Sequence, residues 1–88
     1  DFRWNDWNVE HLAEHGVGPD EAENVVAVFD DRFLAGLGDK WIVWGRGFGG
    51  RLLQVVFVRD EDDSAFILHA RPLTDREKKR CEENNDET

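Results

Sequence analysis

The chain has 88 residues, a formal net charge of −9 and a single cysteine, Cys81. This length fits one domain over residues 1–88 with a single modest core. One cysteine excludes an internal disulfide and any zinc site built from several cysteines. The sequence has no run of about 18 apolar residues and no signal-peptide pattern, so we expect a cytoplasmic protein without a membrane partner.

A first helix is predicted at about residues 5–15, ending before Gly16, a residue that readily adopts the left-handed conformation. Projection at about 100° per residue separates two sides. The apolar side, which we expect to face the core, contains Val9, Leu12 and Ala13. The opposite side groups an indole, an amide and two imidazoles, and we expect it to face a cleft: Trp4, Asn8, His11 and His15.

A second helix is predicted to begin at Pro19, which suits a first helical turn. The acidic Asp20 and Glu21 next to it are favourable at the positive end of the helix dipole. Four apolar residues then follow at helical spacing: Ala22, Val25, Val26 and Phe29. We therefore expect an amphipathic helix that packs on the core.

Strands are predicted from apolar density and from the turn residues between them. A short edge strand is expected at residues 32–35 and a firmer strand at 40–46. Residues 52–59 and 65–71 form a hairpin, because the acidic segment that joins them consists of turn formers. Pro72 ends the second strand of this hairpin.

A final helix is expected from about Asp75, because Thr74 and Glu77 have the spacing of a capping box. This helix is polar nearly all round, and residues 84–88 are expected to be a frayed acidic tail. The sequence therefore predicts an α+β fold in which two N-terminal helices pack on a three- to four-stranded antiparallel sheet, followed by a C-terminal helix.

Alternation along the last strand divides its side chains between the two faces of the sheet. One face is predicted to carry Phe66, Leu68 and Ala70. The other face is predicted to carry Ala65, Ile67, His69 and Arg71. We expect one of these sets, without mixing, to face the core. On the strand at 40–46, alternation groups Ile42, Trp44 and Arg46, so Arg46 could join His69 and Arg71.

Two motifs have alternative interpretations. Residues 45–50 match G-x-G-x-x-G, but the segment leads from strand to strand, so a glycine-rich turn is preferred to a dinucleotide site. His11 and His15 are spaced i, i+4 and could share a metal with His69. We prefer an acid–base role for these imidazoles, with no metal and no cofactor. The alternative for either histidine alone is an ordinary surface residue or a hydrogen-bonded core residue.

The charge is unevenly distributed along the chain. Residues 1–39 contain two basic and ten acidic groups, a balance of −8, whereas residues 40–80 contain nine basic and six acidic groups, a balance of +3. We expect the cations of residues 40–80 to form the main partner-binding surface, with an ordinary solvated surface as the alternative.

A set of short motifs runs in order over about residues 2–83. It consists of Phe2, Trp4, Asn8, His11, His15 to Val17, Pro19, Glu21, Ala22, Gly45, Arg46, Gly50 to Leu53, Val55, Val56, Ala70, Arg71, Leu73, Thr74 and Glu77. This ordered set resembles the BrnT family of bacterial toxins. Two positions depart from the family pattern: Glu14 replaces a lysine, and Cys81 replaces an aromatic residue, usually tyrosine.

The resemblance implies a fold similar to RelE-type toxins and a ribonuclease toxin of a type II toxin–antitoxin pair. Such toxins cleave RNA without a metal. A cognate antitoxin, typically of the ribbon–helix–helix type, silences them, and a homodimer in the antitoxin complex is a further expectation.

Metal-free RNA cleavage needs a base, an acid and cations that stabilise the phosphate. The candidate catalytic residues are His11, His15, Arg46, His69 and Arg71. The candidate RNA-binding residues are Trp44, which could stack on a base, Arg51 and Arg71. The alternative function is a catalytically silent module with the toxin fold that binds a partner protein.

Overall fold

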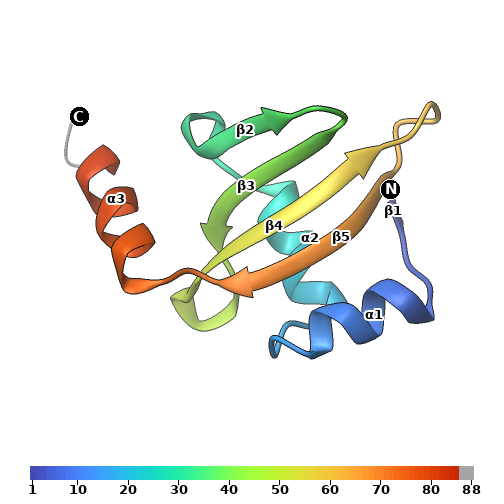
Figure 1. The fold of residues 1–88 in the computed structure, drawn as a ribbon, viewed down its shortest axis with the longest axis horizontal. Coiled ribbons are helices and arrows are strands. Elements are labelled where there is room, and N and C mark those ends of the chain that lie inside the picture. The colour runs from blue at the N-terminus through green and yellow to red at the C-terminus, as the bar shows by residue number, and fades with distance from the viewer. Residues whose placement is uncertain (86–88) are drawn as a thin grey trace.

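The computed structural model describes residues 1–85 as an α+β fold (Figure 1). The helices are α1 (Asp6–Ala13), α2 (Pro19–Ala27) and α3 (Asp75–Asn85). The strands are β1 (Phe2–Arg3), β2 (Leu34–Leu37), β3 (Lys40–Arg46), β4 (Leu52–Arg59) and β5 (Ala65–Pro72). Of the acidic tail predicted at 84–88, residues 86–88 lie outside the described part of the chain.

The described strands form one sheet in the order β1-β5-β4-β3-β2. Every neighbouring pair is antiparallel except β1, which runs parallel to β5 and pairs Phe2 with Ala65. The α+β class is confirmed, whereas the prediction of three to four purely antiparallel strands is wrong. With two residues, β1 is too short to produce any alternation in the sequence.

The edge strand also begins later than predicted at residues 32–35. Asp31–Phe33 form a 3₁₀ turn, because the carboxylate of Asp30 accepts the backbone N–H of Arg32 at 2.9 Å and caps the turn. The strand then begins at Leu34. The predicted strand at 40–46 and the hairpin are confirmed, with β5 one residue longer than expected.

The strongest departure from the predicted alternation is a bulge in β5. Val56 pairs with His69 and Phe57 pairs with Ile67, which leaves Leu68 without a partner across the ladder. An extra residue reverses the alternation beyond it. The core face therefore carries Ala65, Ile67 and Ala70, and the predicted absence of mixing is wrong. His69 and Arg71 share the opposite face, as expected, but without Ile67.

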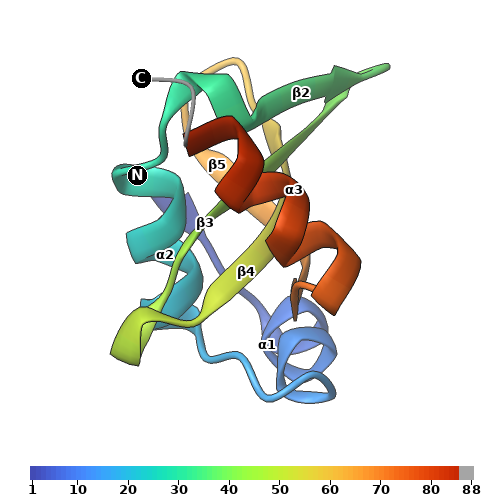
Figure 2. The ribbon, with the colours of Figure 1, turned by 90° about the vertical axis from the view of Figure 1, so that its left-hand side faces the viewer.

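The core lies between the sheet and α2, which covers β3 and β4 on one side (Figure 2). The predicted core residues of this helix are confirmed, with Ala22, Val25 and Val26 buried and Phe29 partly buried. The sheet contributes its inward-facing residues: Val43, Leu53, Val55, Phe57, Ala65, Ile67 and Ala70. The other face of the sheet is half-buried and carries His69 and Arg71.

The first helix turns a different side to the core from the one predicted. Leu12 is buried as expected, but Val9 and Ala13 are exposed, and Asn8 is fully buried. The Asn8 side chain donates from Nδ2 to the carbonyls of Arg3 at 3.1 Å and Ile67 at 3.0 Å. Since Ile67 belongs to β5, this buried amide joins α1 to the sheet by hydrogen bonds to backbone carbonyls.

The glycine-rich segment 45–50 includes the end of β3 and most of the connection to β4, residues 47–51, so the turn predicted there is confirmed. Gly47 lies against the buried carboxylate of Glu21, where a Cβ atom would collide. Gly49 and Gly50 have φ angles of 69° and 80°, in the left-handed region. Backbone geometry therefore accounts for these glycines, without any nucleotide phosphate.

The last helix, α3, extends from the end of the sheet where β3 and β5 finish (Figure 1). Its predicted capping box is confirmed: Thr74 N donates to Glu77 at 2.9 Å, and Glu77 N donates to the Thr74 hydroxyl at 3.2 Å. Among its described side chains only Cys81 is buried. None of the helices in residues 1–85 is both long and apolar enough to cross a membrane.

Candidate functional site

Three imidazoles, from α1, the turn after it and β5, meet where α1 packs along β5. The Nε2 atoms of His15 and His69 lie 3.2 Å apart, within hydrogen-bonding distance. The ring of His11 lies edge-on to His69, with 5.7 Å between centroids. One ring nitrogen of the His15–His69 pair must donate and the other accept, so the pair shares a single proton at this contact. We call His11, His15 and His69 the histidine cluster.

Local structure explains how the histidine cluster forms. His15 lies in the turn after α1, where its N–H binds the carbonyl of Leu12 at 3.0 Å and Gly16 reverses the chain with a φ of 72°. His69 follows the bulge at Leu68, which directs it away from the core. Without the bulge, strict alternation would place His69 on the same face as buried Ile67.

The surroundings of His69 favour its neutral form. Partial burial lowers the pKa of His69, and the charges of His15, His11 and Arg71 lower it further. A neutral imidazole at neutral pH can accept a proton, which is what a general base must do. The side chain of His15 beside it is exposed.

A series of aromatic rings leads into the histidine cluster. Trp7 stacks on His11 with centroids 5.0 Å apart and an angle of 12° between the planes, and it lies 6.3 Å from Phe66. The residue patterns in the sequence do not indicate Trp7 as a site residue. Its position four residues before His11 was the available signal, since i, i+4 side chains on a helix are neighbours.

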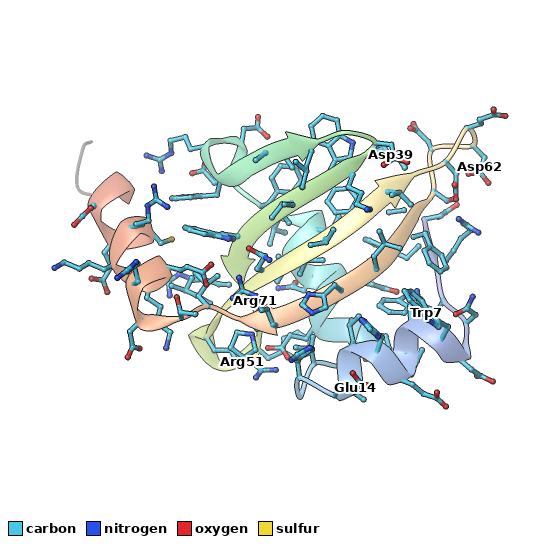
Figure 3. All side chains as sticks on the ribbon, viewed as in Figure 1. Trp7, Glu14, Asp39, Arg51, Asp62 and Arg71 are labelled. Carbon is cyan, nitrogen blue, oxygen red and sulfur yellow. The ribbon has the colours of Figure 1, made fainter. Side chains whose placement is uncertain are left out.

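Arg71 projects from β5 (Figure 3). It follows His69 by two residues beyond the bulge, so both lie on the same face of the sheet. Its Nη1 and Nη2 atoms bind the Glu77 carboxylate at 2.8 and 2.9 Å, and Nη2 also donates to Gln54 at 3.3 Å. The hydrogen bonds from Arg71 lower the pKa of Glu77 to about 2. The Arg71 guanidinium is therefore neutralised in this structure, and a phosphate would have to compete with Glu77.

Arg46 and Trp44 lie away from the histidine cluster, because β4 separates their strand from β5. The Arg46 Nη1 donates to the Gly50 carbonyl at 3.2 Å. Trp44 donates from its indole nitrogen to Gln54 at 3.0 Å. Both line a cavity of about 280 Å³ with Cys81, and burial raises the pKa of that thiol. The structure therefore does not bring Arg46 next to His69 and Arg71.

Glu21 on α2 holds Arg51, which immediately precedes β4. Its side chain donates to the two carboxylate oxygens of Glu21 at 2.8 and 2.5 Å and to the Gly16 carbonyl at 2.7 Å. Arg51 lowers the pKa of Glu21 by its hydrogen bonds, despite the burial of that carboxylate. This geometry gives Arg51 a structural role between α2 and the β3–β4 turn.

The basic surface predicted for residues 40–80 is partly neutralised by ion pairs. Arg51 pairs with Glu21, Arg71 with Glu77, and Arg59 with Asp63 at 3.5 Å. Within residues 1–85, no group of three or more His, Cys, Asp or Glu side chains is arranged to hold a metal ion.

Comparison with protein-family models, with curated proteins and with solved structures found no match to this chain.

Proposed function

We propose that this protein is a metal-independent endoribonuclease that acts as the toxin of a type II toxin–antitoxin pair in the cytoplasm. The single observation that carries the proposal is the contact between His15 and His69, with 3.2 Å between their Nε2 atoms. The order of motifs that resembles BrnT toxins supports the toxin class. A cognate ribbon–helix–helix antitoxin, bound to a toxin homodimer, completes this proposal.

The reaction that suits the pair is transfer of phosphorus to the neighbouring 2′-oxygen. Neutral His69 takes the proton of the 2′-hydroxyl as that oxygen attacks phosphorus. The bond from phosphorus to the 5′-oxygen breaks, and protonated His15 donates a proton to the departing oxygen. The products are a 2′,3′-cyclic phosphate and a 5′-hydroxyl. To act on both sides of the phosphate, the exposed His15 ring must rotate away from His69.

Cations around the pair stabilise the negative charge that grows on the phosphate. Arg71 is the candidate cation two residues from His69 on β5, and its charge already contributes to the lowered pKa of His69. Its guanidinium can donate two parallel hydrogen bonds to phosphate oxygens once Glu77 releases it. The ring of His11 packs edge-on against His69 and so helps to hold that imidazole in position.

The direct test is incubation of the purified protein with a 5′-labelled single-stranded RNA in excess chelator. The proposal predicts cleavage that the chelator does not reduce, and fragments that end in a 2′,3′-cyclic phosphate. Absence of cleavage, or cleavage that requires added divalent metal, would contradict it.

A specific observation favours one second candidate, a silent interaction module. Arg71 and Arg51, two of the proposed RNA-binding cations, are each engaged by a carboxylate, and the chain carries a net charge of −9. Such a protein would attract RNA weakly. Binding of a partner protein without any RNA cleavage would support this alternative.

A further inference from the structure

We infer that a groove between α3 and residues 44–46 of β3 binds an acidic, extended peptide segment of a partner protein. In this complex the segment adds to the free edge of β3 and places apolar side chains in two hollows of the groove. The inference goes beyond the proposed ribonuclease and does not depend on it, because β4 separates this part of β3 from β5 and the histidine cluster.

The first observation is a stretch of strand edge without a strand partner. β2 pairs with β3 only from Lys40 to Val43, whereas β4 continues along β3 to Arg46. Within residues 1–85, residues 44–46 therefore have a neighbouring strand on one side only. Backbone N–H and C=O groups at such an edge can pair with an extended chain that is added to the sheet.

The second observation is open space along this edge. A hollow of about 280 Å³ lies between the end of α2, residues 44–46 of β3 and Cys81 of α3. A second hollow, of about 380 Å³, lies between Arg80 of α3 and the start of β2. Phe33 and Trp44 line both hollows, so the two adjoin in one groove.

The size and lining of the hollows suit single side chains. Both volumes lie near the lower end of the roughly 300–1,000 Å³ that is typical of small-molecule sites. Apolar side chains form most of the walls, among them Val28, Phe29, Phe33, Leu34, Ile42 and Leu52. A peptide that places one large apolar side chain in each hollow would remove this surface from water.

The third observation is the charge of the groove. Arg46 lines the first hollow and Arg80 the second, and both are exposed. Among the described side chains, no carboxylate forms an ion pair with either of them. The third arginine of the groove, Arg32, is paired with Asp30. Two arginines beside an apolar groove complement a segment that carries carboxylates next to its apolar side chains.

The same charges favour a peptide over RNA. An RNA strand needs several cations along its phosphate backbone, and the chain as a whole has a net charge of −9. Aliphatic walls such as Val28 and Leu52 pack against apolar side chains but offer no ring for a base to stack on.

The test begins with a phage-displayed library of octapeptides that alternate acidic and large apolar residues. A matched library alternates basic and apolar residues, and both are selected on the parent protein. We expect binders from the acidic library only. The best binder, synthesised with a fluorescent label, should bind at least about 10-fold more weakly to the double variant Arg46→Glu/Arg80→Glu, since like charges then face each other. The control Lys78→Glu/Lys79→Glu makes the same change of charge beside the groove and should bind like the parent protein.

A second measurement requires no variant. Cys81 is the only cysteine of the chain and lines the first hollow, so a saturating peptide should slow its modification by methyl methanethiosulfonate. Unchanged helical circular dichroism in the double variants ensures that the affinities compare folded proteins.

Four results would overturn the inference: no binder from the acidic library, binders from the basic library only, equal losses of affinity in the two double variants, or binding that leaves the modification rate of Cys81 unchanged. A 2′-O-methylated RNA hexamer that binds where no acidic peptide does would assign the groove to nucleic acid instead. None of these results depends on RNA cleavage, so the chelator assay of the parent protein tests the proposed function separately.

Discussion

Arg71 and Glu77 are joined by two parallel hydrogen bonds, of 2.8 and 2.9 Å, between the end of β5 and the first turn of α3. The same carboxylate accepts the backbone N–H of Thr74 and so caps the helix. One glutamate therefore anchors a polar helix to the sheet and neutralises the arginine proposed to bind phosphate. These two roles make opposite predictions for stability and for RNA binding.

The first prediction concerns the substitution Glu77→Gln. Removing the carboxylate should lower the free energy of unfolding by about 1 kcal/mol, because a bidentate and partly buried ion pair is lost. It should also tighten binding of single-stranded RNA, since Arg71 is released. Denaturant unfolding and fluorescence anisotropy measure the two effects. Glu83→Gln, the same charge change on an exposed residue of α3, is the control. Weaker RNA binding by Glu77→Gln than by Glu83→Gln would remove Arg71 from the site.

The second prediction follows from the low pKa of Glu77. Its pKa falls from an ordinary value of 4.5 to about 2 on folding, so the unfolded chain binds the proton more readily. The stability that the ionised carboxylate contributes is complete above pH 4.5 and is lost as the pH falls towards 2. Urea unfolding between these limits should show a shallower loss of stability in Glu77→Gln than in the parent protein. Parallel curves for the two proteins would contradict the assignment.

The third prediction concerns the buried amide of Asn8. Asn8→Ala leaves the carbonyls of Arg3 and Ile67 without their donor, so we expect a loss of about 2–3 kcal/mol in the free energy of unfolding. Asn5 and Asn8 also form the capping box at the start of α1, in which each side chain accepts the backbone N–H of the other. Asn5→Ala removes one half of this capping box but no buried bond, and should cost about 1 kcal/mol. Equal losses in the two variants would show that Asn8 acts only as a cap.

These residues also show why part of the fold could be predicted from the sequence. Local patterns were sufficient for the hairpin, for α2 and for the Thr74–Glu77 cap, because each depends on neighbouring residues. The side of α1 that faces the core depends on distant backbone carbonyls that bind Asn8. Hydrophobic periodicity has no information about such a contact and selected the exposed Val9.

The candidate site shows the same division. Alternation grouped His69 with Arg71, but the apolar run Phe66, Ile67 and Leu68 fits either face and conceals the bulge that directs both outward. Spacing on one helix grouped His11 with His15, and the fold brings His69 to them. The pairing of Arg71 with Glu77 was missed because the capping box had already accounted for the glutamate.

The fourth prediction is the pH dependence of RNA cleavage. The pKa of His69 is lowered by burial and by the charges of His15, His11 and Arg71. As the proposed base it must be neutral, so the rate should persist as the pH falls through about 6.5, the ordinary value for histidine, and should decline only below it. Arg71→Gln removes one of the nearby charges and should move this decline to higher pH. A decline that begins above pH 6.5 in the parent protein would contradict the role of His69.

The most direct test of the central claim is the single-turnover rate of RNA cleavage by His69→Ala, measured in chelator beside the parent protein. The account predicts a loss of roughly 10²- to 10⁴-fold for His69→Ala. Glu14→Gln, an exposed neighbour of His15, should cleave at the parent rate. Equal rates for His69→Ala and the parent protein, or no cleavage by the parent protein at all, would contradict the assignment of this site to RNA cleavage.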